Sequence, residues 1–183
     1  EIPNNGYANF DIPGAQKLEE YSRKTKFNLL WDGLWGTNDN HYHSKVGKTL
    51  PMQLGMNLGK LVKLSRIKYY QRSGGTSWRY LYAHGNPKKI VVYGAVSKDL
   101  PLNINEENEW IKLTEFISVK PSGLPLNTTN ADDQAVGEQG EDILIPIDAP
   151  AVRVVRFEVG ETWSGVGDFI HIAELTYFGK LEN

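Results

Sequence analysis

The chain contains no cysteine. This absence excludes a disulfide-stabilised scaffold, a thiol nucleophile and a zinc site with cysteine ligands, although it leaves the cellular compartment open. No apolar run approaches the roughly 18 residues that a membrane-spanning helix requires. A large excess of one charge is also missing, because the net charge is only -2 at pH 7. General nucleic-acid binders carry a basic excess, so we expect no nucleic-acid partner.

Strongly helical stretches are scarce, whereas turn-forming and aromatic residues are plentiful. The 183 residues include 18 glycines, 9 prolines and 11% aromatic residues, spread along the chain. This composition suits many short elements joined by turns, and the length suits one domain. Seven segments with β-branched, aromatic or alternating patterns predict strands. They are residues 50–54, 60–72, 90–96, 110–117, 143–147, 152–159 and 169–178.

Helical patterns occur in only two places. Residues 15–24 predict a short helix, in which Glu20 and Lys24 form an oppositely charged pair four positions apart. A second short helix is predicted within the polar residues 130–141. At least seven strands with one or two short helices predict an all-β sandwich or barrel.

Glu174 conflicts with the strand predicted over residues 169–178. Alternation places its carboxylate on the same face as Ile170, Ile172 and Phe178. A carboxylate that points into a core is costly unless a cation or several donors satisfy it. A bound Ca²⁺ ion or a buried arginine would do so, whereas an amphipathic strand end would leave Glu174 in solvent. The residues alone leave these three interpretations open.

An ordered series of short motifs runs through the chain and resembles discoidin domains. In order, they are LWDG at 30–33 with Thr37, HS at 43–44, LG at 54–55, IKYYQR at 67–72, SKD at 97–99, VRVVRFE at 152–158, AEL at 173–175 and YFG at 177–179. Discoidin domains are also called coagulation factor V/VIII type C domains, and the series is most similar to their family 32 carbohydrate-binding modules of bacterial surface proteins. No single motif is specific, but the ordered set is.

The resemblance implies a jelly-roll-like β-sandwich with galactose-binding-domain topology over residues 30–183. An N-terminal lead-in, residues 1–29, is expected to pack on the same domain. The resemblance also implies a structural Ca²⁺ ion between the first loop and the last strand. Its ligands would be oxygens of Asp32, Thr37 and Glu174, together with backbone carbonyls, which are hard donors that suit Ca²⁺. The alternative is that Asp32 is only a turn residue.

Three loops concentrate the residue types that sugar binding requires, namely residues 35–44, 72–84 and 161–168. Sugars present CH faces and hydroxyl edges, so a lectin-like site needs an aromatic platform beside hydrogen-bonding side chains. The resemblance implies that two of the loop residues bind sugar hydroxyls, His43 and Arg72. The predicted ligand contacts are His41, His43, Arg72, Trp78, Tyr82 and Trp163.

Two of these predictions compete with other interpretations. Trp78 and Trp163 fit packing at the rim of the sandwich as well as they fit a ligand platform. His41 and His43 lie two positions apart, so both rings of an extended segment would point the same way and could bind a transition metal with Asp39. No fourth ligand is evident, and a hydrogen-bonding surface is the favoured interpretation.

Catalytic patterns have little support in the sequence. Adjacent carboxylates occur at Asp132-Asp133 and Glu106-Glu107, both in polar segments without a matching histidine. The nucleophile elbow G-x-S-x-G and the zinc motif H-E-x-x-H do not occur. We therefore predict that the protein is not an enzyme.

The resemblance leads to a functional expectation, a non-catalytic carbohydrate-binding module of a secreted or surface-anchored bacterial protein that captures glycans. Expected partners are a glycan and neighbouring domains of a larger protein, and the expected location is extracellular, cell-surface anchored or periplasmic. The chain opens at Glu1 without a signal-peptide pattern, so the residues themselves do not report on secretion. The alternative hypothesis is a protein- or cell-adhesion or assembly domain that binds no sugar.

Overall fold

The computed structural model describes residues 1–36, 39–96, 109–165 and 167–182. Thr37, Glu106 and Glu107 lie outside these ranges. Within them the chain forms nine strands, one α-helix and two short 3-10 helices. The elements are β1 (Ala8–Asn9), η1 (Phe27–Leu30), β2 (Tyr42–His43), β3 (Met52–Tyr70), η2 (Gly75–Ser77), β4 (Pro87–Ala95), β5 (Ile111–Ile117), α1 (Ala131–Gln139), β6 (Glu141–Leu144), β7 (Val152–Thr162), β8 (His171–Ile172) and β9 (Glu174–Leu181).

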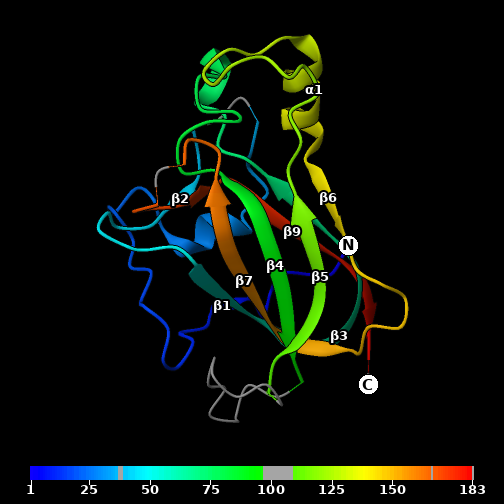
Figure 1. Ribbon diagram of the computed structural model, residues 1–183. Helices are drawn as coiled ribbons and strands as arrows, with labels where there is room; N and C mark the ends of the chain where they lie inside the picture. Colours follow the sequence, from blue (N-terminus) through cyan, green and yellow to red (C-terminus); the bar gives the residue numbers. More distant parts are fainter. Residues whose placement is uncertain (37–38, 97–108, 166, 183) are drawn as a thin grey trace.

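The strands form a seven-stranded antiparallel sheet and a separate pair (Figure 1). In the large sheet the order is β1-β3-β7-β4-β5, and β6 and β9 both pair with β3. The separate pair consists of β2 and β8. The all-β fold class predicted from the sequence is therefore confirmed.

The long strand β3 connects the two layers of the sandwich. Its first part pairs with β7, and its second part pairs with β9 and β6. The register against β7 shifts between Asn57 and Val62, and Gly59 between them adopts φ +73°. A left-handed residue at a bulge bends a strand, so one 19-residue strand serves both layers. The sequence predicts two strands here, because the strand pattern is interrupted at the residues where β3 bends.

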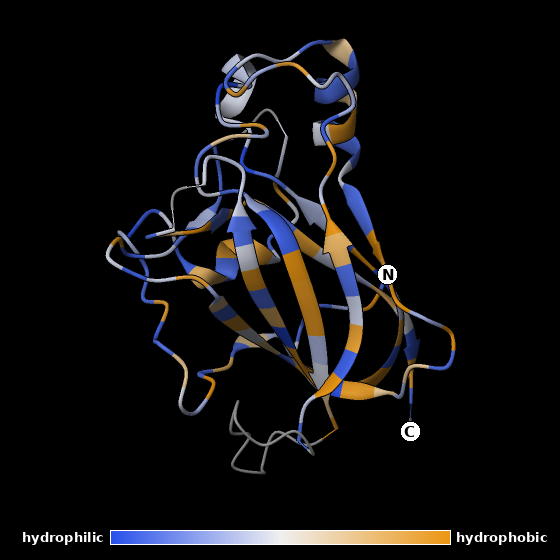
Figure 2. Cartoon of the chain, viewed as in Figure 1, coloured by the Kyte–Doolittle hydropathy of each residue, from blue (hydrophilic) through white to orange (hydrophobic). Residues whose placement is uncertain are grey.

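The main core lies between the layers. Alternate residues of β3 point inward and are almost completely buried, including Met52, Leu54, Ile67 and Tyr69. Figure 2 shows hydrophobic and hydrophilic bands that alternate along β5 and β7, the pattern of strands with one buried face. Apolar burial at roughly 25 cal/mol per Å² is the main term that stabilises such a core.

The helix predicted over residues 15–24 is wrong. No helix forms here: Glu20 forms an isolated β-bridge with Ser44, and residues 21–24 are bends and turns. The backbone N–H of Tyr21 donates to the carbonyl of His43 (2.8 Å), and that of Lys45 donates to Glu19 (2.7 Å). Pairing with an otherwise open strand edge therefore outweighs the weak helical preference of this segment.

The second predicted helix is confirmed as α1. Asn130 caps its N-terminus, because its side chain accepts from the N–H of Asp133 (3.0 Å), while the Asp133 carboxylate accepts from the N–H of Asn130 (3.2 Å). This nine-residue helix is the longest in the described part of the chain. In that part no helix is long and apolar enough to cross a membrane.

The strand predicted over residues 169–178 is two strands. Its first part, β8, pairs with β2, and its second part, β9, pairs with β3. Ala173 between them is 1% exposed. Ile170 to Leu175 are all buried, so alternation does not hold where the chain passes from one sheet to the other.

Candidate functional site

A pocket of about 400 Å³ lies at one end of the sandwich, beside β2 and the loop that follows β3. We call it the His–Arg pocket. Segments far apart in the sequence meet here, including the lead-in, β2 and the segment before β8. It is lined by Tyr21, Ser22, Lys24, Thr25, Asp39, His41, His43, Val46, Arg72 and Phe169.

Arg72 is held in a fixed orientation in the pocket wall. Its Nε and Nη2 donate to the two carboxylate oxygens of Asp39 (2.9 and 3.2 Å), and its guanidinium lies 3.9 Å from the centre of the Tyr80 ring. The side chain of Asn86 fixes the backbone of Arg72: it accepts a hydrogen bond from the N–H of Arg72 (2.9 Å) and donates one to the carbonyl of Arg72 (3.0 Å). Nη1 has no hydrogen-bond partner in the described ranges and remains available to a ligand.

His43 lies between two aromatic rings, and we call Tyr21, His43 and Phe169 the rim stack. The centre of the His43 ring is 4.7 Å from the centre of the Phe169 ring, with 18° between the two planes, and 4.9 Å from the centre of the Tyr21 ring. Its Nδ1 is 2.6 Å from the carbonyl of Ser44, which can only accept. Nδ1 therefore carries the proton, and Nε2 offers a lone pair to a hydroxyl.

All four histidines of the chain gather around this pocket. His41 and His43 each lie within about 6 Å of the buried His171, ring centre to ring centre, and His84 packs on Tyr80. Burial, and then the charge of Arg72, lowers the pKa of His41 to about 4 and holds that of His171 well below its usual range. The imidazoles are therefore neutral at pH 7.

The geometry of His171 shows how its neutral form is fixed. Its Nδ1 lies 3.0 Å from Oδ1 of Asn86, and its Nε2 accepts from the N–H of Gly85 (3.2 Å). Because Asn86 also holds Arg72, one buried hydrogen-bond network supports the pocket wall. Among the described residues, no group of three histidine, aspartate or glutamate side chains is placed to hold a metal ion.

Three predicted ligand contacts form a separate group, which we call the inner cluster: Trp78, Tyr82 and Trp163. Tyr82 is completely buried, Trp78 is 8% exposed, and Tyr82 packs edge-on against Trp163 (5.1 Å). Trp163 also donates to the hydroxyl of Ser118 (3.2 Å). The structure therefore places Trp78 and Tyr82 in a small core of their own, and Trp163 packs against it while remaining half-buried.

The inner cluster forms because α1 covers the loop. A Cβ atom on Gly137 of α1 would lie 3.0 Å from the ring of Trp78 and 2.9 Å from Leu81. The loop turns back under the helix through positive φ angles at Gly74, Trp78 and Tyr82. The predicted site residues that remain together at the pocket are His41, His43 and Arg72.

Three residues that line the pocket are not among the predicted ligand contacts, namely Tyr21, Asp39 and Phe169. The sequence pattern places Tyr21 in a predicted helix, whereas in the structure it is 57% exposed and lies against His43. Phe169 was assigned to a strand face, although it immediately precedes β8. An aromatic residue in an otherwise polar segment, such as Tyr21, is the sequence signal that could have indicated this side of the His–Arg pocket.

Glu174 lies beside the first loop, as the resemblance implied. It is 3% exposed, and its Oε2 accepts from the N–H of Gly33 (3.2 Å). Burial, and to a lesser degree the charge of Asp32, raises the pKa of Glu174 to about 8. Of the three interpretations, a solvent-exposed strand end is therefore wrong, and no arginine or lysine pairs with Glu174 among the described side chains.

The Asp32 carboxylate makes other contacts in this structure. Its Oδ1 accepts from the N–H of Leu34 (3.0 Å), and its Oδ2 accepts from the side chain of Asn40 (2.7 Å). The contact with the N–H of Leu34 is the one expected if Asp32 is a turn residue, the alternative to a calcium ligand. Asp32 and Glu174, 142 positions apart in the chain, are nevertheless close enough that the charge of Asp32 raises the pKa of Glu174, and both carboxylates are hard oxygen donors.

The carboxylate pair Asp132-Asp133 has a structural explanation. Asp133 is completely buried and takes part in the α1 capping box, and it also accepts from the N–H and hydroxyl of Ser122 (3.0 and 2.7 Å). Asp132 is exposed in the first turn of α1, where a negative charge is favourable.

Solved structures share this fold. SusE-like protein BT2857 is 24% identical to this chain, with a TM-score of 0.84 over 97% of this chain and 99% of that one. CBM32-3 from a family 31 glycoside hydrolase of Clostridium perfringens is 19% identical, with a TM-score of 0.60 over 91% and 90%. The family 32 module of C. perfringens NanJ, solved with galactose, is 18% identical, with a TM-score of 0.58 over 96% of each chain.

These likenesses support the predicted sandwich at the level of the fold. The two clostridial structures are binding modules by their descriptions, not catalytic domains. None of the curated proteins compared with the chain is significantly similar to it. A family model described as a domain of unknown function, DUF5000, matches residues 31–179, and the chain belongs to this family.

Proposed function

We propose that the protein is a non-catalytic carbohydrate-binding module and that the His–Arg pocket is its ligand site. The observation that carries this proposal is the meeting of His43, Arg72 and two half-exposed or exposed rings in one pocket of about 400 Å³. A second support is the fold, which modules described as carbohydrate-binding share.

The pocket offers the groups that a sugar ring requires. Tyr21 and Phe169 supply apolar surfaces for the CH face of the ring. Nε2 of His43 accepts a hydrogen bond from one hydroxyl, and Nη1 of Arg72 donates to another. Because Asp39 and Tyr80 already hold the guanidinium, little conformational entropy is lost when the ligand binds.

The lining also supports the absence of catalysis. Glycoside hydrolysis uses two carboxyl groups that face each other across the bond to be cleaved. The pocket lining contains one carboxylate, that of Asp39, and both of its oxygens bind Arg72. Such a carboxylate is poorly suited to donate or accept the protons of the reaction.

We place this module in a larger secreted or surface-anchored bacterial protein that captures glycans. SusE-like protein BT2857, which matches along nearly its whole length, and the clostridial modules support this context. The expected partners are a glycan and neighbouring domains of the same protein.

A glycan array followed by calorimetric titration of the best glycan tests the proposal. Arg72→Ala should weaken binding by about 1.5–3 kcal/mol, roughly 10- to 100-fold, because a charged hydrogen bond is lost. Arg66→Ala is the matched control, since its guanidinium also lies over a ring, that of Phe178 (4.2 Å), on β9. No binding across plant, host and microbial glycans would contradict the proposal and favour the adhesion hypothesis.

We also propose a structural Ca²⁺ ion held by Asp32 and Glu174, with Thr37 as the further ligand implied by the resemblance. The buried carboxylate of Glu174, next to a second acidic side chain, supports it, because a cation would offset the cost of burying the charge. EDTA should lower the melting temperature, and Glu174→Gln should do the same and remove the effect of EDTA. An unchanged melting curve in EDTA would refute the calcium site.

A further inference from the structure

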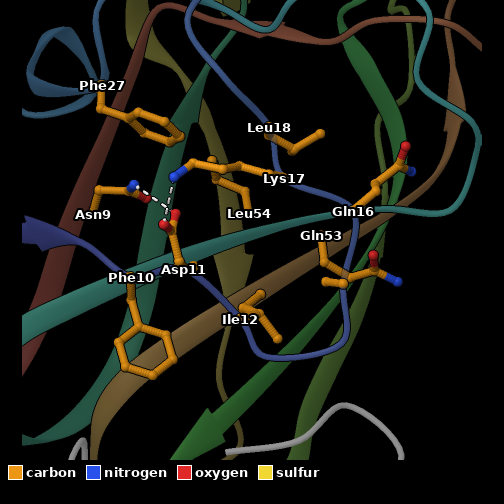
Figure 3. Close-up of a pocket in the computed structure, with 12 residues that line it drawn as sticks. Asn9, Phe10, Asp11, Ile12, Gln16, Lys17, Leu18, Phe27, Gln53 and Leu54 are labelled. Carbon is orange, nitrogen blue, oxygen red and sulfur yellow. Dashed lines mark hydrogen bonds and ion pairs between the residues drawn. The ribbon is translucent and has the colours of Figure 1, made fainter.

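A second pocket, of about 230 Å³, lies between the lead-in and β3 (Figure 3). We call it the lead-in pocket. It shares no lining residue with the His–Arg pocket, although both use the lead-in as one wall. Its lining comprises Asn9, Phe10, Asp11, Ile12, Ala15, Gln16, Lys17, Leu18, Phe27, Gln53, Leu54 and Gly55.

The pocket exists because the lead-in approaches β3 closely at Gly55. The N–H of Phe10 donates to the carbonyl of Gly55 (3.0 Å), and a Cβ atom on Gly55 would lie only 2.2 Å from the carbonyl oxygen of Phe10. Farther along, the side-chain amide of Gln16 exchanges hydrogen bonds with the backbone of Thr49. These attachments fix both ends of the segment that covers the pocket.

The polar groups of the pocket include both donors and acceptors. The ammonium of Lys17 forms an ion pair with the carboxylate of Asp11 (Nζ to Oδ2, 2.9 Å), and the side-chain amide of Asn9 donates to the same carboxylate (3.2 Å), as Figure 3 shows. Gln53 also lines the pocket; its side-chain amide is half-buried and has no hydrogen-bond partner among the described residues. It therefore has a donor and an acceptor to offer to a ligand.

Apolar surfaces complete the lining. The rings of Phe10 and Phe27 lie on different sides of the Asp11–Lys17 pair in Figure 3, and Leu18 and Leu54 are buried behind it. The ammonium and the carboxylate compensate each other, so the pocket carries no net charge to favour an anion or a cation. The pocket volume of about 230 Å³ is smaller than that of the His–Arg pocket and suits one small ring rather than a chain.

We infer that the lead-in pocket is a second binding site, which takes a neutral polyhydroxylated ring such as a monosaccharide. The CH face of the ring contacts Phe10 or Phe27. Its hydroxyls bind the free amide of Gln53 and the remaining lone pairs of Asp11. This inference does not depend on the proposed function of the His–Arg pocket, because the two linings share no residue.

Amide ¹H–¹⁵N NMR titrations with D-galactose, D-glucose and D-mannose test the inference. At least one of these sugars should shift the amide signals of Phe10 and Gly55 saturably, and the shifts should persist in Arg72→Ala. Gln53→Leu should weaken this binding about fivefold, the size expected for one lost hydrogen bond. D-galacturonate and D-glucosamine, which carry a charge, should bind more weakly than the neutral sugars.

Gln139→Leu makes the same change at the end of α1 and should leave the binding unaltered. If Gln53→Leu does not fold, Asp11→Asn replaces it, because the Asp11 side chain is 61% exposed and tolerates the change. The inference is overturned if none of the three sugars shifts Phe10 and Gly55, or if the Gln53 and Asp11 variants bind as the unmodified protein does. Shifts confined to His43 and Arg72 would overturn it while supporting the proposed function.

Discussion

The rim stack and the inner cluster are built from similar residues but have opposite surroundings. Both come from segments with polar or glycine neighbours, and both contain a tyrosine. Tyr21 of the rim stack is 57% exposed, whereas Tyr82 of the inner cluster is completely buried. The difference arises because α1 covers the inner cluster, while the rim stack borders the His–Arg pocket. Aromatic residues in a loop therefore indicate a binding site only where no other element covers them.

The largest expected effect is on stability, at the inner cluster. Tyr82→Ala should lower the free energy of unfolding by about 3–5 kcal/mol, because a buried aromatic side chain leaves a cavity. Glycan affinity of the folded fraction should not change, since Tyr82 is not part of the pocket lining. Urea unfolding and calorimetric titration measure the two quantities. A loss of affinity without loss of stability would reverse our assignment of the two groups.

The next largest effect is the pH dependence of the free energy of unfolding, which we expect to arise from His41 in the His–Arg pocket. The unfolded chain binds a proton on His41 near pH 6.5, but the folded chain does so only near pH 4, because His41 is buried beside Arg72. Its contribution to stability is therefore complete above pH 6.5 and is lost as the pH falls toward 4.

Urea unfolding at several pH values between 6.5 and 4 measures the slope of the free energy of unfolding against pH. The charged groups around His41 are Asp39 and Arg72, and the neighbouring titratable groups are His43 and His171. His41→Gln should reduce the slope, whereas Tyr82→Phe should leave it unaltered. An equal slope in the unmodified protein and His41→Gln would contradict the burial argument.

The smallest expected effect is at Tyr21. Tyr21→Ala should weaken glycan binding by about 1 kcal/mol, roughly fivefold, since it removes one apolar surface of the pocket. Stability should change little because the side chain is mostly exposed. Tyr21→Phe keeps the ring and should bind normally, as titration calorimetry can show. Normal binding by Tyr21→Ala would remove the lead-in from the ligand site.

Much of the fold could be predicted because strand patterns depend on burial, which alternates with a period of two. The failures lie where tertiary contacts decide the outcome. Residues 19–21 pair with residues 43–45, so the segment 15–24 does not form a helix despite its charge spacing. Gly59 bends β3 between layers, which no local pattern distinguishes from a strand end.

The site could be predicted only in part, for a related reason. Histidine and arginine reveal their chemistry in the sequence, so His41, His43 and Arg72 were found. Whether a tryptophan lines a pocket or a small core depends on the packing of α1, a long-range contact. The contribution of Tyr21 likewise depends on where the lead-in runs.

A crystal structure of the protein with its tightest-binding glycan would show whether the His–Arg pocket is the ligand site. We predict a sugar ring against Tyr21 or Phe169, with hydroxyls bonded to Nε2 of His43 and Nη1 of Arg72. A glycan bound against Trp163, with no contact to His43 or Arg72, would contradict the proposed ligand site.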